Sequence, residues 1–97
     1  MKLGRVVGNV WATRKDARLS SLTLLLVQCL DIITKEPDGA PIVAEDNIGA
    51  GFGELVIVVS GSSARSAAGD MNIPVDAAVV AIVDNFDLAS GEKKGTK

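Results

Sequence analysis

The chain has 97 residues, of which 47% are hydrophobic and 3% aromatic, so it is expected to form one small domain with an aliphatic core. Because so small a core cannot absorb that many apolar side chains, part of the apolar surface is expected to lie between subunits. The formal net charge of −2 argues against nucleic acid and anionic membranes as partners, since both attract clusters of Lys and Arg. The chain has no histidine and a single cysteine, which excludes a histidine base or ligand and an internal disulfide.

Residues 3–13 are expected to form a strand in which Gly4 and Gly8 interrupt the apolar residues. Glycine weakens a strand, but it permits bending and the close approach of another backbone. A curved strand of a small barrel suits this pattern. Trp11 is expected to pack in the core or at an interface rather than to stack on a ligand.

The polar residues 14–21 are expected to form a solvated loop, with a basic contact patch as the alternative interpretation. Residues 22–33 fit two patterns, because their leucines follow a helical stripe while their β-branched residues favour a strand. The pattern favours the strand only slightly. Cys29 lies inside this run and is expected to be a small buried hydrophobe, because no histidine is present to lower its pKa.

Residues 34–41 are expected to form a turn around Pro37-Asp38-Gly39, and residues 42–44 a short strand. Glu45, Asp46 and Asn47 follow as an acidic cluster. They lack the alternating ligand spacing of a calcium loop, so they are expected to form a solvated turn and no metal site.

Residues 49–53 read GAGFG, which superficially resembles a phosphate-binding loop. Such a loop must be followed by a helix whose N-terminus faces the phosphate. Here the apolar residues 54–60 follow and predict a buried strand, so the nucleotide interpretation fails. The glycines are better explained by positive φ angles or by tight approach of neighbouring chains.

Residues 60–65 read SGSSAR, which suggests a serine nucleophile, but no histidine exists to act as its base. Ser62 or Ser63 is instead expected to cap a helical turn over residues 63–68. Arg65 would then be free to reach a carboxylate or a carbonyl, on its own chain or on a neighbour.

Residues 79–83 predict the last strand, buried on both faces, and the following Asp84 and Asp87 lack the aromatics of a sugar-cleaving site. Residues 1–86 are therefore expected to form one domain, and residues 87–97 a flexible tail. Four or five short strands curved by glycines, with one helical turn, indicate an all-β fold, a small closed or nearly closed barrel. No cofactor and no enzymatic activity are expected.

Four segments carry a resemblance to the EutN/CcmL family of bacterial microcompartment vertex proteins: MKLGRVVGNVWATRK, LTLLLVQCLD, AEDNIGAGFGELVIVVSGSSAR and PVDAAVVAIVD. The resemblance implies a five-stranded OB-like β-barrel, with a strand rather than a helix at residues 22–33. It also implies a structural protein that forms homopentamers in the bacterial cytoplasm. These would cap the vertices of a carboxysome-like or metabolosome shell, with hexameric shell proteins as neighbours.

A ring closes through two different complementary surfaces on each protomer. Our hypothesis is that the glycine loop lies near the ring axis or interface, and that the turn ending at Arg65 anchors a contact between protomers. The residues assigned to this interface are Gly49, Ala50, Gly51, Gly53, Ser62, Ser63 and Arg65. The alternative function is an OB-like module that binds single-stranded nucleic acid or another ligand.

Overall fold

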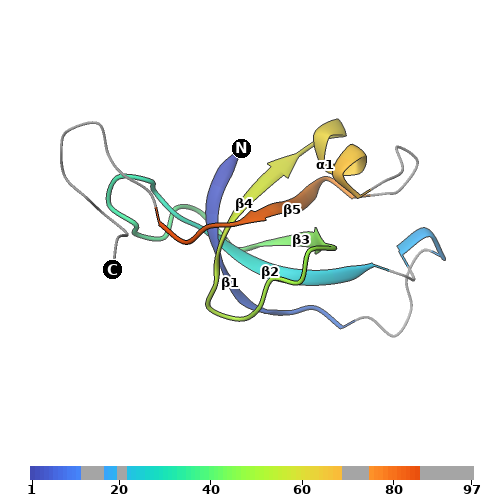
Figure 1. Cartoon of the computed structure of the whole chain (residues 1–97), viewed down its shortest axis with the longest axis horizontal. Helices are drawn as coiled ribbons and strands as arrows, with labels where there is room; N and C mark the ends of the chain where they lie inside the picture. The colour runs from blue at the N-terminus through green and yellow to red at the C-terminus, as the bar shows by residue number, and fades with distance from the viewer. Residues whose placement is uncertain (12–16, 20–21, 69–74, 86–97) are drawn as a thin grey trace.

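The computed structural model describes residues 1–11, 17–19, 22–68 and 75–85. They form five strands, one short α-helix and one 3-10 turn (Figure 1). In chain order these are β1 (Lys2–Asn9), η1 (Ala17–Leu19), β2 (Thr23–Cys29), β3 (Ile42–Asp46), β4 (Leu55–Ser60), α1 (Ser62–Ala67) and β5 (Ala77–Ile82). The predicted tail over residues 87–97 lies outside the described residues, as does most of the predicted loop over residues 14–21. No helix among the described residues is long and apolar enough to cross a membrane.

The strands close into a barrel in the order β1-β2-β3-β5-β4. All neighbours are antiparallel except β3 and β5, which run parallel. This confirms the expected fold class, a small five-stranded barrel with one short helical segment. It also confirms a strand, not a helix, within residues 22–33.

The ladder between β3 and β5, which we call the seam, is the shortest in the barrel. Only Glu45 with Ala78 and Asp46 with Val79 are paired across it, whereas each other ladder joins four or five residue pairs. The chain reaches β5 from β3 by way of β4 and α1, and α1 packs outside β4 and β5. Closure of the barrel therefore depends on a few residues at the end of β3.

The core is aliphatic and lies inside the barrel, as composition predicts. It consists of Val6, Leu25, Val27, Ala44, Val56, Val58, Ala77 and Val79. A smaller cluster of Val59, Ala64 and Ala78 fixes α1 on the outside of β4 and β5. The prediction that residues 79–83 are buried on both faces is wrong, because Val80 and Ala81 are half-buried and Ile82 is exposed. The pairing with β3 ends at Val79, so β3 does not flank the second half of β5.

Two strands are shorter than the sequence predicts. β1 ends at Asn9, and Trp11 beyond it is 88% exposed, so it is not a core residue of the protomer. β2 ends at Cys29, and the chain then turns where the carboxylate of Asp31 accepts hydrogen bonds from the amides of Ile33 and Thr34. An aspartate that binds the backbone two and three residues ahead stabilises a turn in place of a strand.

Gly4 allows the close contact between strands that its position predicts. A Cβ atom added at Gly4 would lie 2.5 Å from Cγ1 of Val27 and 3.3 Å from the carbonyl oxygen of Gln28. Gly8 sits where the register between β1 and β2 shifts, consistent with bending of the strand. A Cβ atom there would meet only Cβ of Leu26, at 3.9 Å.

We predict that Gly4→Ala destabilises the barrel by about 1–3 kcal/mol, because the new methyl group must displace Val27 or separate β1 from β2. Thermal or urea unfolding measures the change. Gly8→Ala is the matched control, since its methyl group makes an ordinary van der Waals contact. Equal stability of the two variants would contradict the close-packing role of Gly4.

Candidate functional site

The candidate site is the loop over residues 47–54, which joins β3 to β4 and contains the glycines assigned to the interface. Figure 1 shows it running from the end of β3 past β1 to the start of β4. Hydrogen bonds tie the end of the loop to β1. The amide of Gly53 donates to the carbonyl of Val6 at 2.8 Å, and the amide of Val6 donates to the carbonyl of Glu54 at 3.0 Å.

Asp46, the last residue of β3, holds the start of the loop. It is 5% exposed, and its two carboxylate oxygens accept hydrogen bonds from the amides of Ile48 at 3.1 Å and Ala50 at 3.0 Å. The expectation of a solvated turn at Glu45, Asp46 and Asn47 is therefore wrong for the first two, which are buried in β3. The physical reason is that Asp46 supplies the acceptors that the loop backbone needs.

The second half of the loop is fixed by Glu54 and Arg5. A carboxylate oxygen of Glu54 accepts a hydrogen bond from the amide of Gly51 at 2.6 Å, and the guanidinium of Arg5 donates to the carbonyl of Gly53 at 2.8 Å. Gly49 and Gly53 have φ angles of 89° and 86°, which confirms the predicted need for glycine at these two positions. These constraints leave the loop one preferred conformation.

The loop presents apolar side chains to solvent. Phe52 is 81% exposed and Ile48 45% exposed, whereas Ala50 packs against the barrel core. Large exposed apolar side chains on a constrained loop are typical of protein contact sites. The sequence reasoning missed Phe52, although a lone aromatic residue between two glycines is a signal that could have drawn attention to it.

The second predicted group lies at α1. Gly61, with a φ angle of 65°, occupies the N-cap position and no side chain caps the helix, so the prediction that Ser62 or Ser63 is the cap is wrong. Both serines are exposed in the first turn. The carbonyl of Gly61 accepts from the amides of Ala64 and Arg65, and the fully buried Ala64 holds the helix on the barrel.

Arg65 is half-buried on α1. Its guanidinium makes no hydrogen bond or ion pair with any residue that the structure describes. The start of the loop over residues 47–54 reaches α1, because Nδ2 of Asn47 donates a hydrogen bond to the carbonyl of Ala67 at 3.4 Å. The predicted interface residues thus lie on two elements, the glycine loop and α1, and no hydrogen bond between described residues joins the two sets.

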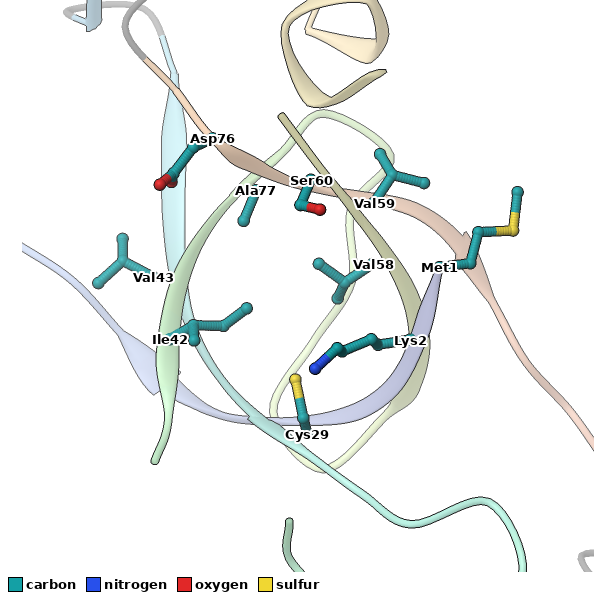
Figure 2. Close-up of a pocket in the computed structure, with 10 residues that line it drawn as sticks. All are labelled: Met1, Lys2, Cys29, Ile42, Val43, Val58, Val59, Ser60, Asp76 and Ala77. Atoms are coloured by element: carbon teal, nitrogen blue, oxygen red, sulfur yellow. The ribbon is translucent and has the colours of Figure 1, made fainter. Parts of the chain in front are cut away.

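A cavity of about 570 Å³ opens at one end of the barrel. Figure 2 shows Lys2, Cys29, Ser60 and Asp76 among its apolar walls. Cys29 is 6% exposed, which confirms it as a buried residue. No group of three or more Cys, Asp or Glu side chains in the described part of the chain is arranged to hold a metal ion.

Comparison with known proteins assigns this barrel to a protein family. The profile of the family described as "Ethanolamine utilisation protein EutN/carboxysome" matches residues 1–84. The shell vertex protein GrpN of Rhodospirillum rubrum is 47% identical, over 93% of this chain and all of its own. The shell vertex protein EutN of Escherichia coli is 48% identical, over 94% of this chain and 93% of its own.

Two solved structures share the fold closely. The "GrpN pentameric microcompartment shell protein from Rhodospirillum rubrum" gives a TM-score of 0.81 at 45% identity, with 91% of this chain and 99% of that chain covered. CcmL of Gloeobacter violaceus gives a TM-score of 0.87 at 35% identity, with 99% and 100% covered. The chain belongs to the EutN/CcmL family. This is a family of microcompartment shell vertex proteins, which are structural proteins and not enzymes.

Family membership favours the structural function over the alternative of an OB-like nucleic-acid module. It also directs attention to the surfaces through which a shell protein contacts its neighbours.

We predict that Asp46→Ala destabilises the protein by about 2–3 kcal/mol, because the amides of Ile48 and Ala50 lose their acceptors in a partly buried position. Unfolding by urea measures the loss. Asp31→Ala is the matched control, since it also removes the acceptor of two amides, but at an exposed turn where water replaces it. A control that loses as much stability as Asp46→Ala would contradict the anchoring role.

Proposed function

We propose that this chain assembles into a homopentamer that closes the five-fold vertices of a microcompartment shell in the bacterial cytoplasm, beside hexameric shell proteins. The observation that carries the proposal is the match, over nearly the whole of both chains, to a solved shell protein described as pentameric.

A closed ring needs two different surfaces on each protomer, each complementary to the other. The loop over residues 47–54 provides one, since it projects Phe52 and Ile48 from a fixed backbone. The start of α1 provides the other, where two serine hydroxyls are exposed and Arg65 lacks a partner among the described residues. They lie on two different elements, the loop between β3 and β4 and the helix α1, as two complementary surfaces of a ring contact require.

The glycines contribute to this contact by keeping the loop in one conformation. Binding is weakened when a loop must be ordered on contact, so a loop that is already fixed loses less free energy on assembly. Gly49, Ala50, Gly51 and Gly53 thus support the interface through the backbone, while Ser62, Ser63 and Arg65 supply hydrogen-bond donors and acceptors.

Co-expression with hexameric shell proteins tests the function. We expect closed particles when this protein is present, and sheets, tubes or unclosed shells when it is omitted. Electron microscopy of the purified assemblies distinguishes these outcomes. A protein that remains monomeric at micromolar concentration, or shells that close equally well without it, would contradict the proposal.

We predict that Arg65→Ala lowers the fraction of intact rings at low protein concentration, because a multidentate cation is lost from the contact between protomers. Native mass spectrometry over a dilution series measures the fraction, and we expect the midpoint of dissociation to rise about tenfold for a loss of about 1.4 kcal/mol. Lys2→Ala, which removes an exposed cation from β1, is the control. An unchanged ring mass for Arg65→Ala at every dilution would show that Arg65 does not anchor the ring.

A further inference from the structure

Glu45 is a buried carboxylate without a partner. It is 1% exposed, and neither of its side-chain oxygens has a hydrogen-bond partner. Its neighbour Ala44 belongs to the core inside the barrel, so alternation along β3 turns Glu45 to the outer face. There it lies between Leu24 of β2 and Ala78 of β5, which pair with it on either side. An unpartnered polar group at such a position needs a physical explanation.

The residues that pair with Glu45 on β2 and β5 bring it no positive charge. Both are apolar, and the one charged side chain of α1, Arg65, makes no ion pair with it. The charged group beside it on β3 is Asp46, another carboxylate. The pKa of Glu45 is raised above its ordinary value of 4.5 by two effects, of which burial is the larger and the charge of Asp46 the smaller.

Among the described residues, no hydrogen-bond donor reaches the carboxylate of Glu45 in the closed barrel. Two backbone amides that follow β3 in the chain, those of Ile48 and Ala50, are already bound by Asp46. Water can stabilise the ionised form, and it reaches the buried carboxylate when the end of β3 separates from its neighbours. The seam is where this separation is easiest, because two residue pairs hold it and Glu45 is in one of them.

We propose that Glu45 is a proton-binding site built into the barrel seam, where the folded protein holds the neutral acid and loss of the proton favours opening between β3 and β5. Since the loop over residues 47–54 begins at this seam, deprotonation also loosens the surface that carries Phe52. Opening of the seam is a property of the single protomer and does not depend on assembly. The consequence for the ring rests on the proposed function.

The sign of the pH dependence follows from linkage. A carboxyl group whose pKa is raised on folding binds more protons in the folded state than in the unfolded state. Glu45 therefore causes no loss of folding free energy at pH values below the pKa it has in the unfolded chain, near 4.5. The loss grows as the pH rises toward the pKa of Glu45 in the folded state, and it is constant above that pKa. Stability due to Glu45 is thus greatest in acid, opposite to the behaviour of a carboxylate in an ion pair.

The test compares the natural protein with Glu45→Gln, which keeps the size of the side chain and cannot ionise. Melting temperatures are measured between pH 4.5 and 8.5, and the difference between the two proteins cancels the titration of all other groups. We expect the melting temperature of Glu45→Gln, relative to the natural protein, to rise with pH. The rise should reach at most about 5–11 °C per pH unit and level off at high pH. Glu36→Gln, at an exposed turn, is the matched control.

A difference that stays constant across the pH range would overturn the proposal, as would one that rises toward low pH. If Glu45→Gln fails to fold, hydrogen exchange on the natural protein decides the question. We then expect protection of the amides at residues 77–80 to fall with pH, after correction for intrinsic exchange, while that of residues 25–28 does not. Equal changes in both segments would refute an opening at the seam.

Native mass spectrometry of the natural protein separates this inference from the proposed function. If rings of the natural protein dissociate more readily at pH 8 than at pH 5.5, and this pH effect is smaller in Glu45→Gln, the result supports both the ring and the role of Glu45. A protein that is monomeric at every pH contradicts the ring, while the melting temperatures still decide the role of Glu45.

Discussion

The parallel pairing of β3 with β5 is the constraint on which the rest of the structure depends. Without it the five strands form an open sheet, and the aliphatic core between β2, β3 and β4 would be exposed along one edge. Closure removes that edge, but only two residue pairs achieve it. Both residues that β3 contributes are acidic, and both are buried. The barrel is thus closed at a point where desolvated carboxylates must be tolerated.

The two carboxylates at the seam have opposite energetic roles. Asp46 receives two amide donors and fixes the loop that follows, so its burial is offset by hydrogen bonds. Glu45 receives none, so its burial disfavours the charged form. Because the two groups are adjacent, the proton on Glu45 also relieves repulsion with Asp46. Barrel closure, loop geometry and protonation are therefore linked through one dipeptide.

Much of the fold could be predicted from the sequence, because β-branched runs such as residues 54–60 have few alternatives to a buried strand in a small domain. The burial of the residues at the end of β3 could not be predicted. Glu-Asp-Asn beside glycines has the composition of a solvated turn, and only tertiary pairing with β5 shows that the first two residues are buried. The prediction of a serine helix cap was wrong for a similar reason. Gly61 adopts a positive φ angle and donates its amide to the carbonyl of Asp76, so the geometry at the N-cap does not depend on a serine hydroxyl.

The special backbone of the glycine loop could be predicted from the sequence, whereas the side chains that the loop exposes were not anticipated. The glycines marked residues 49–53 as a special loop, yet the side chains that it exposes are Phe52 and Ile48. Two of the three aromatic residues of the chain, Trp11 and Phe52, are exposed by more than 80% in the protomer. Aromatic residues are enriched in protein interfaces, where burial on association recovers the free energy lost by exposure. The excess of apolar residues over what the core can hold thus finds a consistent explanation in contacts between protomers, and the firmly held loop over residues 47–54 is the part of this surface best prepared to make them.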